Sequence, residues 1–238
     1  MTRAERIRNF PKTGWRNFLA RQLASLSRHP APSAFLDYQT KTALHLPFAG
    51  EWYVYWGGRS PAQNRHVVAN DQRFAYDFLI LSNGHRGQSF RGSGQSNTDY
   101  LCFGQPVYAP ADGTVLKAEN DMPDNQPGEM NPKSVLGNYV VLDHGSGEFS
   151  FLVHLRQGTL SVNVGDQVHR GQQLAQCGNS GNSSEPHLHY HLQNTPAPFL
   201  GDGLPAFFVE YVADGKSLDR GQPVARQTVR STREFSGQ

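Results

Sequence analysis

The chain has 238 residues, a formal net charge of +2 and a hydrophobic content of 37%, with 24 glycines and 15 prolines. It contains no run of eighteen or more apolar residues, so no transmembrane span is predicted. The small net charge does not indicate nucleic acid as the main partner. This composition is typical of a turn-rich globular protein, and a chain of this length can form one large all-β domain or two smaller ones.

The first 43 residues are predicted to form an arm outside the main domain. Residues 1–30 carry seven Arg and Lys residues against one acid, Glu5. This surplus favours contact with an anionic polymer or surface, or it belongs to a solvated arm. A short amphipathic helix is predicted from apolar residues at helical spacing, namely Trp15, Phe18, Leu19, Leu23 and Leu26. The segment has the charge of a signal peptide without its continuous apolar stretch, so export by a cleaved signal is not indicated.

From about residue 44 to residue 212 the pattern changes to short strand-like runs separated by Gly, Asn and Asp. The predicted strands are Glu51–Trp56, Phe74–Leu81, Pro106–Tyr108, Gly113–Ala118, Tyr139–Asp143, Glu148–Leu155, Gln172–Gln176, His187–Gln193 and Ala206–Tyr211. They recur about every ten residues with no helical pattern between them. This spacing predicts an all-β sandwich or barrel.

Three further segments are predicted to be irregular. Ser82–Asn97 and Glu119–Ser134 are rich in Gly, Ser, Pro and Asn, so each is expected to be a long loop that frames a binding site or is disordered. Residues 213–238 contain few apolar side chains and are assigned to a C-terminal tail. This tail is expected to wrap the surface or to fray.

One predicted strand contains three histidines at alternate positions, in the stretch EPHLHYHL. Successive side chains of a strand point to opposite faces, so His187, His189 and His191 share one face. The other face carries Leu188, Tyr190 and Leu192, which suits a hydrophobic core. Imidazoles arranged in this way bind a metal, transfer protons or line a solvated face.

A catalytic zinc ion takes three protein ligands from His, Asp or Glu and keeps one position for water. The histidine strand therefore needs another histidine and a carboxylate from elsewhere in the chain. The segment NRHVVANDQRFAYDFL, at Asn64–Leu79, supplies His66 together with Asp71 or Asp77.

Three blocks of sequence resemble the lysostaphin-type (LytM-like) zinc metallopeptidases, a family of peptidoglycan-cleaving endopeptidases. They are His66 followed by AYDF at 75–78, FLVHL at 151–155, and GNSG at 178–181 followed by HLH at 187–189. Between them lie phrases typical of the same family, VYAPADGTV at 107–115, GNYVVLDHG at 137–145 and VGDQVHRGQ at 164–172. The resemblance covers roughly residues 44–212.

The resemblance implies a zinc ion held by His66, Asp77 and His189, with His154 and His187 as the catalytic pair beside it. It also implies hydrolysis of peptide bonds in peptidoglycan cross-links or bridges. The expected fold is a twisted, mainly antiparallel β-sheet or sandwich of the barrel-sandwich-hybrid kind, with a groove between long loops. A cell-wall substrate would favour the periplasm or cell envelope, although the sequence shows no clear export signal. His191 has no role in the family and is expected at the rim of the site or behind the ligands.

The first motif departs from the family pattern. The family places the aspartate four positions after the histidine, whereas Asp77 follows His66 by eleven positions and Asp71 follows it by five. Asp77 is preferred because Phe74, Tyr76 and Phe78 alternate around it as in a buried strand, while Asp71 lies in a turn-like segment. The inserted residues are expected to form a loop beside the metal, with substrate contacts from Asn70 or Arg73.

Two other classes of function are compatible with parts of the sequence. A catalytically inactive relative could keep the fold and regulate another cell-wall hydrolase by binding, and a phosphocarrier of the sugar phosphotransferase type also presents two close histidines. Cys102 and Cys177 do not form a zinc-type pair and are too few for a disulfide scaffold. One bridge between them is compatible with the sequence.

Overall fold

The computed structural model describes residues 30–85 and 87–232. The helix predicted between Trp15 and Leu26 lies outside these residues. Within the described part of the chain the regular elements are β-strands and two short 3-10 helices, Arg65–Val68 (η1) and Asn97–Asp99 (η2). No helix in this part is long and apolar enough to cross a bilayer.

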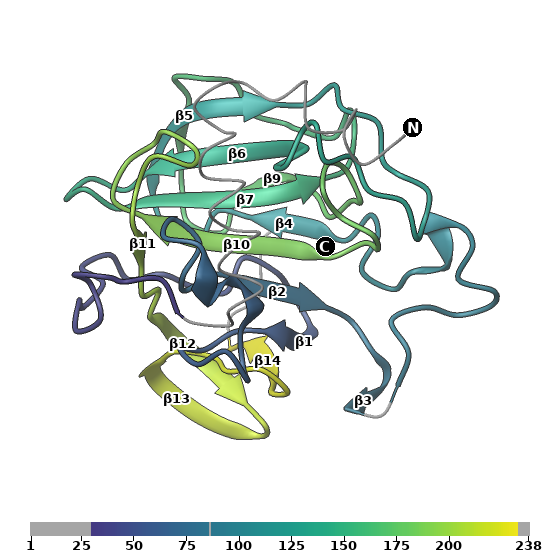
Figure 1. The fold of residues 1–238 in the computed structure, drawn as a ribbon, viewed down its shortest axis with the longest axis horizontal. Helices are drawn as coiled ribbons and strands as arrows, with labels where there is room; N and C mark the ends of the chain where they lie inside the picture. The colour runs from purple at the N-terminus through teal and green to yellow at the C-terminus, as the bar shows by residue number, and fades with distance from the viewer. Residues whose placement is uncertain (1–29, 86, 233–238) are drawn as a thin grey trace.

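Apart from β3, the described strands form one large antiparallel sheet and a separate pair (Figure 1). The strands are β1 (Glu51–Trp56), β2 (Tyr76–Leu79), β3 (Ser82–His85), β4 (Pro106–Tyr108), β5 (Gly113–Glu119), β6 (Asn138–Asp143), β7 (Phe149–Leu155), β8 (Gln167–Val168), β9 (Gln173–Gln176), β10 (Leu188–Gln193), β11 (Gly203–Leu204), β12 (Phe208–Ala213), β13 (Lys216–Gly221) and β14 (Thr228–Ser231). The order in the 11-stranded sheet is β13-β12-β14-β1-β2-β10-β7-β6-β5-β8, with β11 paired to β10, and β4 pairs with β9. The prediction of an all-β, mainly antiparallel fold is confirmed.

The C-terminal segment differs from the predicted tail. Residues 216–221 and 228–231 are strands of the large sheet, and β14 pairs with both β1 and β12. The side chain of Val229 on β14 is fully buried. The sequence KSLDRG of β13 gave no alternating apolar pattern because the strand lies at the sheet edge, exposed along nearly its whole length.

The part of the N-terminal arm that the structure describes packs on the β domain. Glu148, directly before β7, is fully buried and accepts hydrogen bonds from the Tyr38 hydroxyl at 2.7 Å and from the backbone N–H groups of Lys41 and Thr42 at 2.6 and 2.8 Å. Burial alone would raise the pKa of this carboxyl group, but the hydrogen bonds hold the pKa below its usual value. Residues 38–42 are therefore bound to the domain through an ionised carboxylate.

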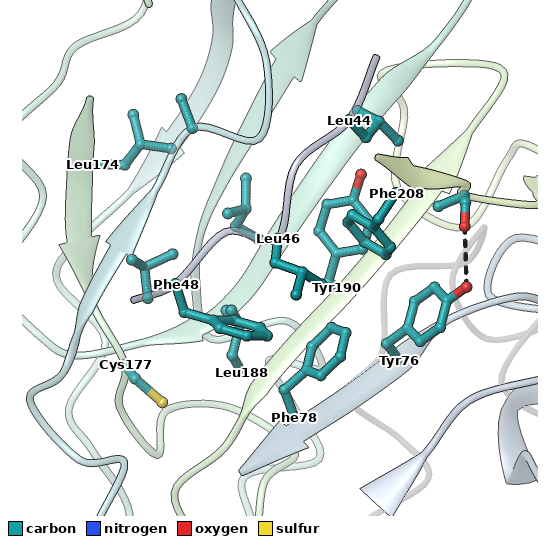
Figure 2. Packing of buried hydrophobic residues seen from close by; sticks show 14 of the residues in the cluster. Leu44, Leu46, Phe48, Tyr76, Phe78, Leu174, Cys177, Leu188, Tyr190 and Phe208 are labelled. Atoms are coloured by element: carbon teal, nitrogen blue, oxygen red, sulfur yellow. Dashed lines mark hydrogen bonds between the residues drawn. The ribbon is translucent and has the colours of Figure 1, made fainter. Parts of the chain in front are cut away.

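The core lies on the face of the sheet opposite the histidines. Figure 2 shows Phe48, Phe78, Tyr190 and Phe208 packed together. In the same view the Tyr76 hydroxyl donates to the carbonyl oxygen of Ala206, at 3.0 Å. Fully burying one such side chain contributes roughly 1.5–3 kcal/mol. The core therefore fixes the faces of β2 and β10, and the predicted core positions of Leu188, Tyr190 and Leu192 are confirmed.

The strand register places Asp77 and His189 side by side. β10 lies between β2 and β7, and His189 is paired with Asp77 on one side and with Val153 on the other. His154 follows Val153 directly. The Cys102 and Cys177 thiols are buried and free, so no bridge joins them in this structure.

Candidate metal centre

Three side chains from separate segments converge on the histidine face of the sheet. The Asp77 carboxylate lies between two imidazoles, with Oδ2 3.0 Å from Nε2 of His66 and Oδ1 2.9 Å from Nδ1 of His189. One ligand atom from each residue lies within 4.8 Å of the others, and no further grouping of this kind occurs in residues 30–85 and 87–232. Two nitrogens and one oxygen thus form a candidate metal site.

His66 and Asp77 are eleven positions apart in the sequence, and the side chain of Asn64 connects the two segments by hydrogen bonds. Its fully buried side chain caps η1 by accepting from the His66 backbone N–H at 2.9 Å, and it donates to the carbonyl oxygens of Gly58 and Ala75 at 3.0 and 2.9 Å. One amide therefore joins the segment that carries His66 to the residues just before Asp77. Asp71 is buried but lies outside the metal-site grouping.

The inserted loop does not offer Arg73 to a substrate, contrary to our expectation. The Arg73 side chain is buried, and its guanidinium group donates to the carbonyl oxygens of Ala31 and Val67. It holds the loop to the N-terminal segment, because the Ala31 N–H also donates to the Val67 carbonyl oxygen at 2.7 Å. Asn70 is exposed.

The predicted catalytic pair lies beside this centre. The rings of His154 and His187 have centroids 4.9 Å apart, and Nε2 of His187 is 3.7 Å from Oδ1 of Asp77. Nδ1 of His154 lies 2.8 Å from the carbonyl oxygen of Ser180, and Nδ1 of His187 lies 2.8 Å from that of Glu185. Because a carbonyl oxygen can only accept, both rings carry their hydrogen on Nδ1 and expose a lone pair on Nε2.

The electrostatics of the site favour neutral imidazoles and an ionised carboxylate. Burial lowers the pKa of His66 to about 4, although the nearby Asp77 charge opposes this shift. Burial also lowers the pKa of His187, and it places the pKa of His154 well below its usual value. Burial alone would raise the pKa of Asp77, but the surrounding imidazoles of His66, His187 and His189 keep that pKa well below its usual range. This is the protonation state in which such residues bind a metal ion.

Two hollows flank the centre. One, of about 280 Å³, is lined by His66, His154 and His189, and the other, of about 160 Å³, is lined by Asp77, His187 and the aromatic side chains of Tyr55 and Trp56. Arg65, Met130 and Asn182 line both hollows. Met130 belongs to the predicted loop Glu119–Ser134, so this loop frames the site. The other predicted loop, Ser82–Asn97, contacts the second hollow through Ser89, whose hydroxyl donates to Glu185 at 2.9 Å.

Sequence reasoning missed Arg65 as a feature of the site. Its side chain is 57% exposed and its guanidinium group lies 3.4 Å from Oδ2 of Asp77. The residue directly precedes His66, and this adjacency was the available signal.

Comparison with known proteins gives a match to one family model and to several sequence relatives. The family model described as "Peptidase family M23" matches residues 94–199, a range that includes His154, His187 and His189 but not His66 or Asp77. The chain is 32% identical over 142 residues to the peptidoglycan DD-endopeptidase ShyA of Vibrio cholerae (56% of this chain, 29% of that protein). It is 32% identical over 124 residues to the murein hydrolase activator EnvC of Escherichia coli (49% of this chain, 28% of that protein).

A third relative is matched over most of its length. The chain is 30% identical over 90 residues to the lipoprotein NlpD of Yersinia enterocolitica, covering 38% of this chain and 78% of that sequence. The chain spans less than a third of the length of ShyA and of EnvC. From these sequence matches, together with the predicted motifs and the His-Asp-His centre, we conclude that the chain belongs to peptidase family M23.

Proposed function

We propose that this protein is a zinc-dependent endopeptidase that hydrolyses peptide bonds in peptidoglycan cross-links or bridges. The observation that carries the proposal is the convergence of His66, Asp77 and His189 beside two imidazoles that expose Nε2 lone pairs. The similarity to a peptidoglycan DD-endopeptidase supports the choice of substrate.

The donor set fits zinc. Two neutral imidazole nitrogens and one carboxylate oxygen are a usual set of protein ligands for a catalytic zinc ion. Nε2 of His187 is also buried without a hydrogen-bond partner and lies 3.7 Å from Oδ1 of Asp77. Nε2 of His66, a carboxylate oxygen of Asp77 and Nδ1 of His189 would hold the ion. When bound, zinc would supply a Lewis acid and lower the pKa of a water molecule to about 7.

His154 and His187 would serve the proton transfer from the attacking water to the leaving amine. Nε2 of His187 presents its lone pair next to the Asp77 carboxylate, so it accepts a proton from the attacking water. The Glu185 carbonyl oxygen keeps the hydrogen of the neutral ring on Nδ1, so Nε2 is free to accept. The protonated ring then returns that proton to the nitrogen of the amine as the C–N bond breaks. His154, in the same tautomer and with its ring centroid 4.9 Å from that of His187, presents a second Nε2 lone pair beside the site.

The two hollows would hold the peptide on either side of the bond to be cut. The first combines apolar Val135, Leu136 and Val153 with the polar Gln72. The second offers Tyr55, whose side chain is half exposed, and the neighbouring ring of Trp56. Together they suit a peptide with both apolar and polar groups. No nucleic-acid partner is proposed.

Digestion of purified peptidoglycan tests the function directly. We expect the protein to release peptide fragments, identified by mass, and to stop doing so when a chelator removes the metal. His189→Ala should lose both the zinc measured by atomic absorption and the hydrolysis. Bound zinc without any release of fragments would contradict the enzyme and would favour a binding regulator, the class suggested by the name of the activator EnvC. Absence of zinc would reject the metal site as well.

A further inference from the structure

The second histidine of β10, His191, takes no part in the mechanism above. Its side chain is buried, and its Nδ1 lies 3.1 Å from Nε2 of His189. Its ring also stacks on Phe151, its partner in the β10–β7 register, with centroids 4.5 Å apart and planes within 15° of parallel. The stack and the strand fix the orientation of this ring toward one nitrogen of His189.

The direction of this hydrogen bond follows from the proposed role of His189. Nδ1 of His189 lies 2.9 Å from Oδ1 of Asp77, a carboxylate oxygen that can only accept, so without a metal ion this nitrogen carries the ring hydrogen. As a metal ligand the same nitrogen must instead present a lone pair. A neutral His189 ring then carries its hydrogen on Nε2. That N–H points at Nδ1 of His191, which must therefore accept, so His191 carries its own hydrogen on Nε2.

We infer that His191 is a positioning residue that accepts the Nε2–H hydrogen bond of His189 and so fixes the tautomer and ring orientation in which His189 binds the metal. The inference rests on the proposed function, because it takes His189 as a ligand. Histidines that bind metals almost always donate their second N–H to a carboxylate, a carbonyl oxygen or water. In this chain a neutral imidazole occupies that place.

Burial makes the acceptor necessary. His189 is 3% exposed and His191 is 2% exposed. A buried N–H that loses its acceptor keeps the cost of desolvation without the hydrogen bond, so the ligand ring would be held less firmly in the required tautomer. Removing outer partners of this kind typically lowers metal affinity 10- to 100-fold.

Two substitutions separate the hydrogen bond from the packing. His191→Phe keeps an aromatic ring for the stack on Phe151 but has no acceptor, whereas His191→Asn keeps an acceptor in its side-chain carbonyl oxygen but loses the stack. Zinc affinity of each full-length variant would be measured by competition with a chromophoric chelator. We expect His191→Phe to bind zinc about 10- to 100-fold more weakly, and His191→Asn to recover most of this loss. Equal affinity of wild type and His191→Phe would overturn the inference, as would a loss in His191→Asn as large as that in His191→Phe.

A measurement without substitution covers the case in which a variant does not fold. In the zinc-loaded wild-type protein, long-range ¹H–¹⁵N spectra of the histidine rings should show Nε2 protonated in both His189 and His191. A proton on Nδ1 of His191 would overturn the inference. The two proposals fail separately. If the wild-type protein binds no zinc, the proposed metal site is rejected. If His189→Ala abolishes zinc binding but His191→Phe leaves it unchanged, only the role of His191 is rejected.

Discussion

His154 and His187 share one hydrogen-bonding arrangement, since each ring donates through Nδ1 to a backbone carbonyl oxygen 2.8 Å away. The two carbonyl oxygens belong to Ser180 and Glu185, in the segment that leads into β10. His154 also has a φ of 62°, a left-handed conformation that histidine adopts more readily than most residues. Backbone carbonyl oxygens therefore set the tautomers of both catalytic candidates, and at His187 the Ser183 hydroxyl also lies 3.1 Å from Nδ1.

Neither ring belongs to the metal-site grouping, so their removal should separate binding from turnover. We expect His187→Ala and His154→Ala each to keep zinc and to lower the rate of peptide hydrolysis by roughly 10²- to 10⁴-fold, as loss of a general acid–base group does. Zinc content and hydrolysis would be measured on the same samples. His169→Ala, at an exposed turn position, is the control and should change neither quantity. Zinc loss in His187→Ala equal to that in His189→Ala would contradict the assigned roles.

The metal-free protein should lose stability as the pH falls. Burial lowers the pKa of His66 from 6.5 to about 4, so between these values the unfolded chain binds a proton that the folded chain does not. The free energy of unfolding therefore decreases with falling pH across this window, by roughly 3 kcal/mol for this group at the acid end. The pKa values of His154 and His187 are lowered too and act in the same direction.

Urea unfolding of chelator-treated protein at about pH 7.5 and about pH 5 measures this effect. His66→Asn is the matched variant and should show a smaller decrease. The lowered pKa of Asp77 affects stability only below the ordinary aspartate pKa of 3.8, because there the unfolded carboxylate takes up a proton first. Unchanged or higher stability at the lower pH would contradict the prediction.

Asn64→Ala should weaken both the fold and the metal site. The substitution removes the cap of η1 and the two hydrogen bonds that join this segment to Gly58 and Ala75, so we expect a loss of roughly 1–3 kcal/mol in the free energy of unfolding. His66 would then be held less firmly near Asp77, and zinc affinity should fall. Chemical unfolding and chelator competition measure the two effects. Asn70→Ala, in the exposed part of the same loop, should leave both near the wild-type values.

The C-terminal strands should contribute to the stability of the whole domain. Val229→Ala removes a fully buried side chain from β14, and we expect a loss of roughly 2 kcal/mol in the free energy of unfolding. Leu218→Ala on β13, where the side chain is 36% exposed, is the control and should cost much less. Equal, small effects of both substitutions on urea unfolding would contradict the place of β14 in a cooperative sheet.

The alternation of residue types identified most of the central strands, because one face of each strand packs in the core and the other does not. β10 has Tyr190 in the core and His189 on the opposite face, and the printed sequence shows this alternation. β13 was missed because its exposed edge residues carry no such pattern. β14 was missed because Val229 is its single apolar position. Local sequence also does not indicate which partner a buried ring finds, so the contact between Nε2 of His189 and Nδ1 of His191 required coordinates.

The motif expected from the family identified the metal-site residues only in part. Alternation favoured Asp77 over Asp71, and the structure brings Asp77 to both His66 and His189. The eleven-residue separation could not be interpreted from spacing alone, because it is closed by the buried amide of Asn64. The burial of Arg73 was likewise unpredictable from its own sequence, since its partner Ala31 lies 42 positions away.

The carboxylate of Glu148 has a practical consequence for anyone who excises this domain. A fragment that begins at residue 44, where the strand pattern starts, would lack Tyr38, Lys41 and Thr42 and leave an orphaned anion in the interior. Such a truncated protein would also lack Ala31, which helps to anchor the loop after His66. Recombinant versions should therefore start upstream of residue 30.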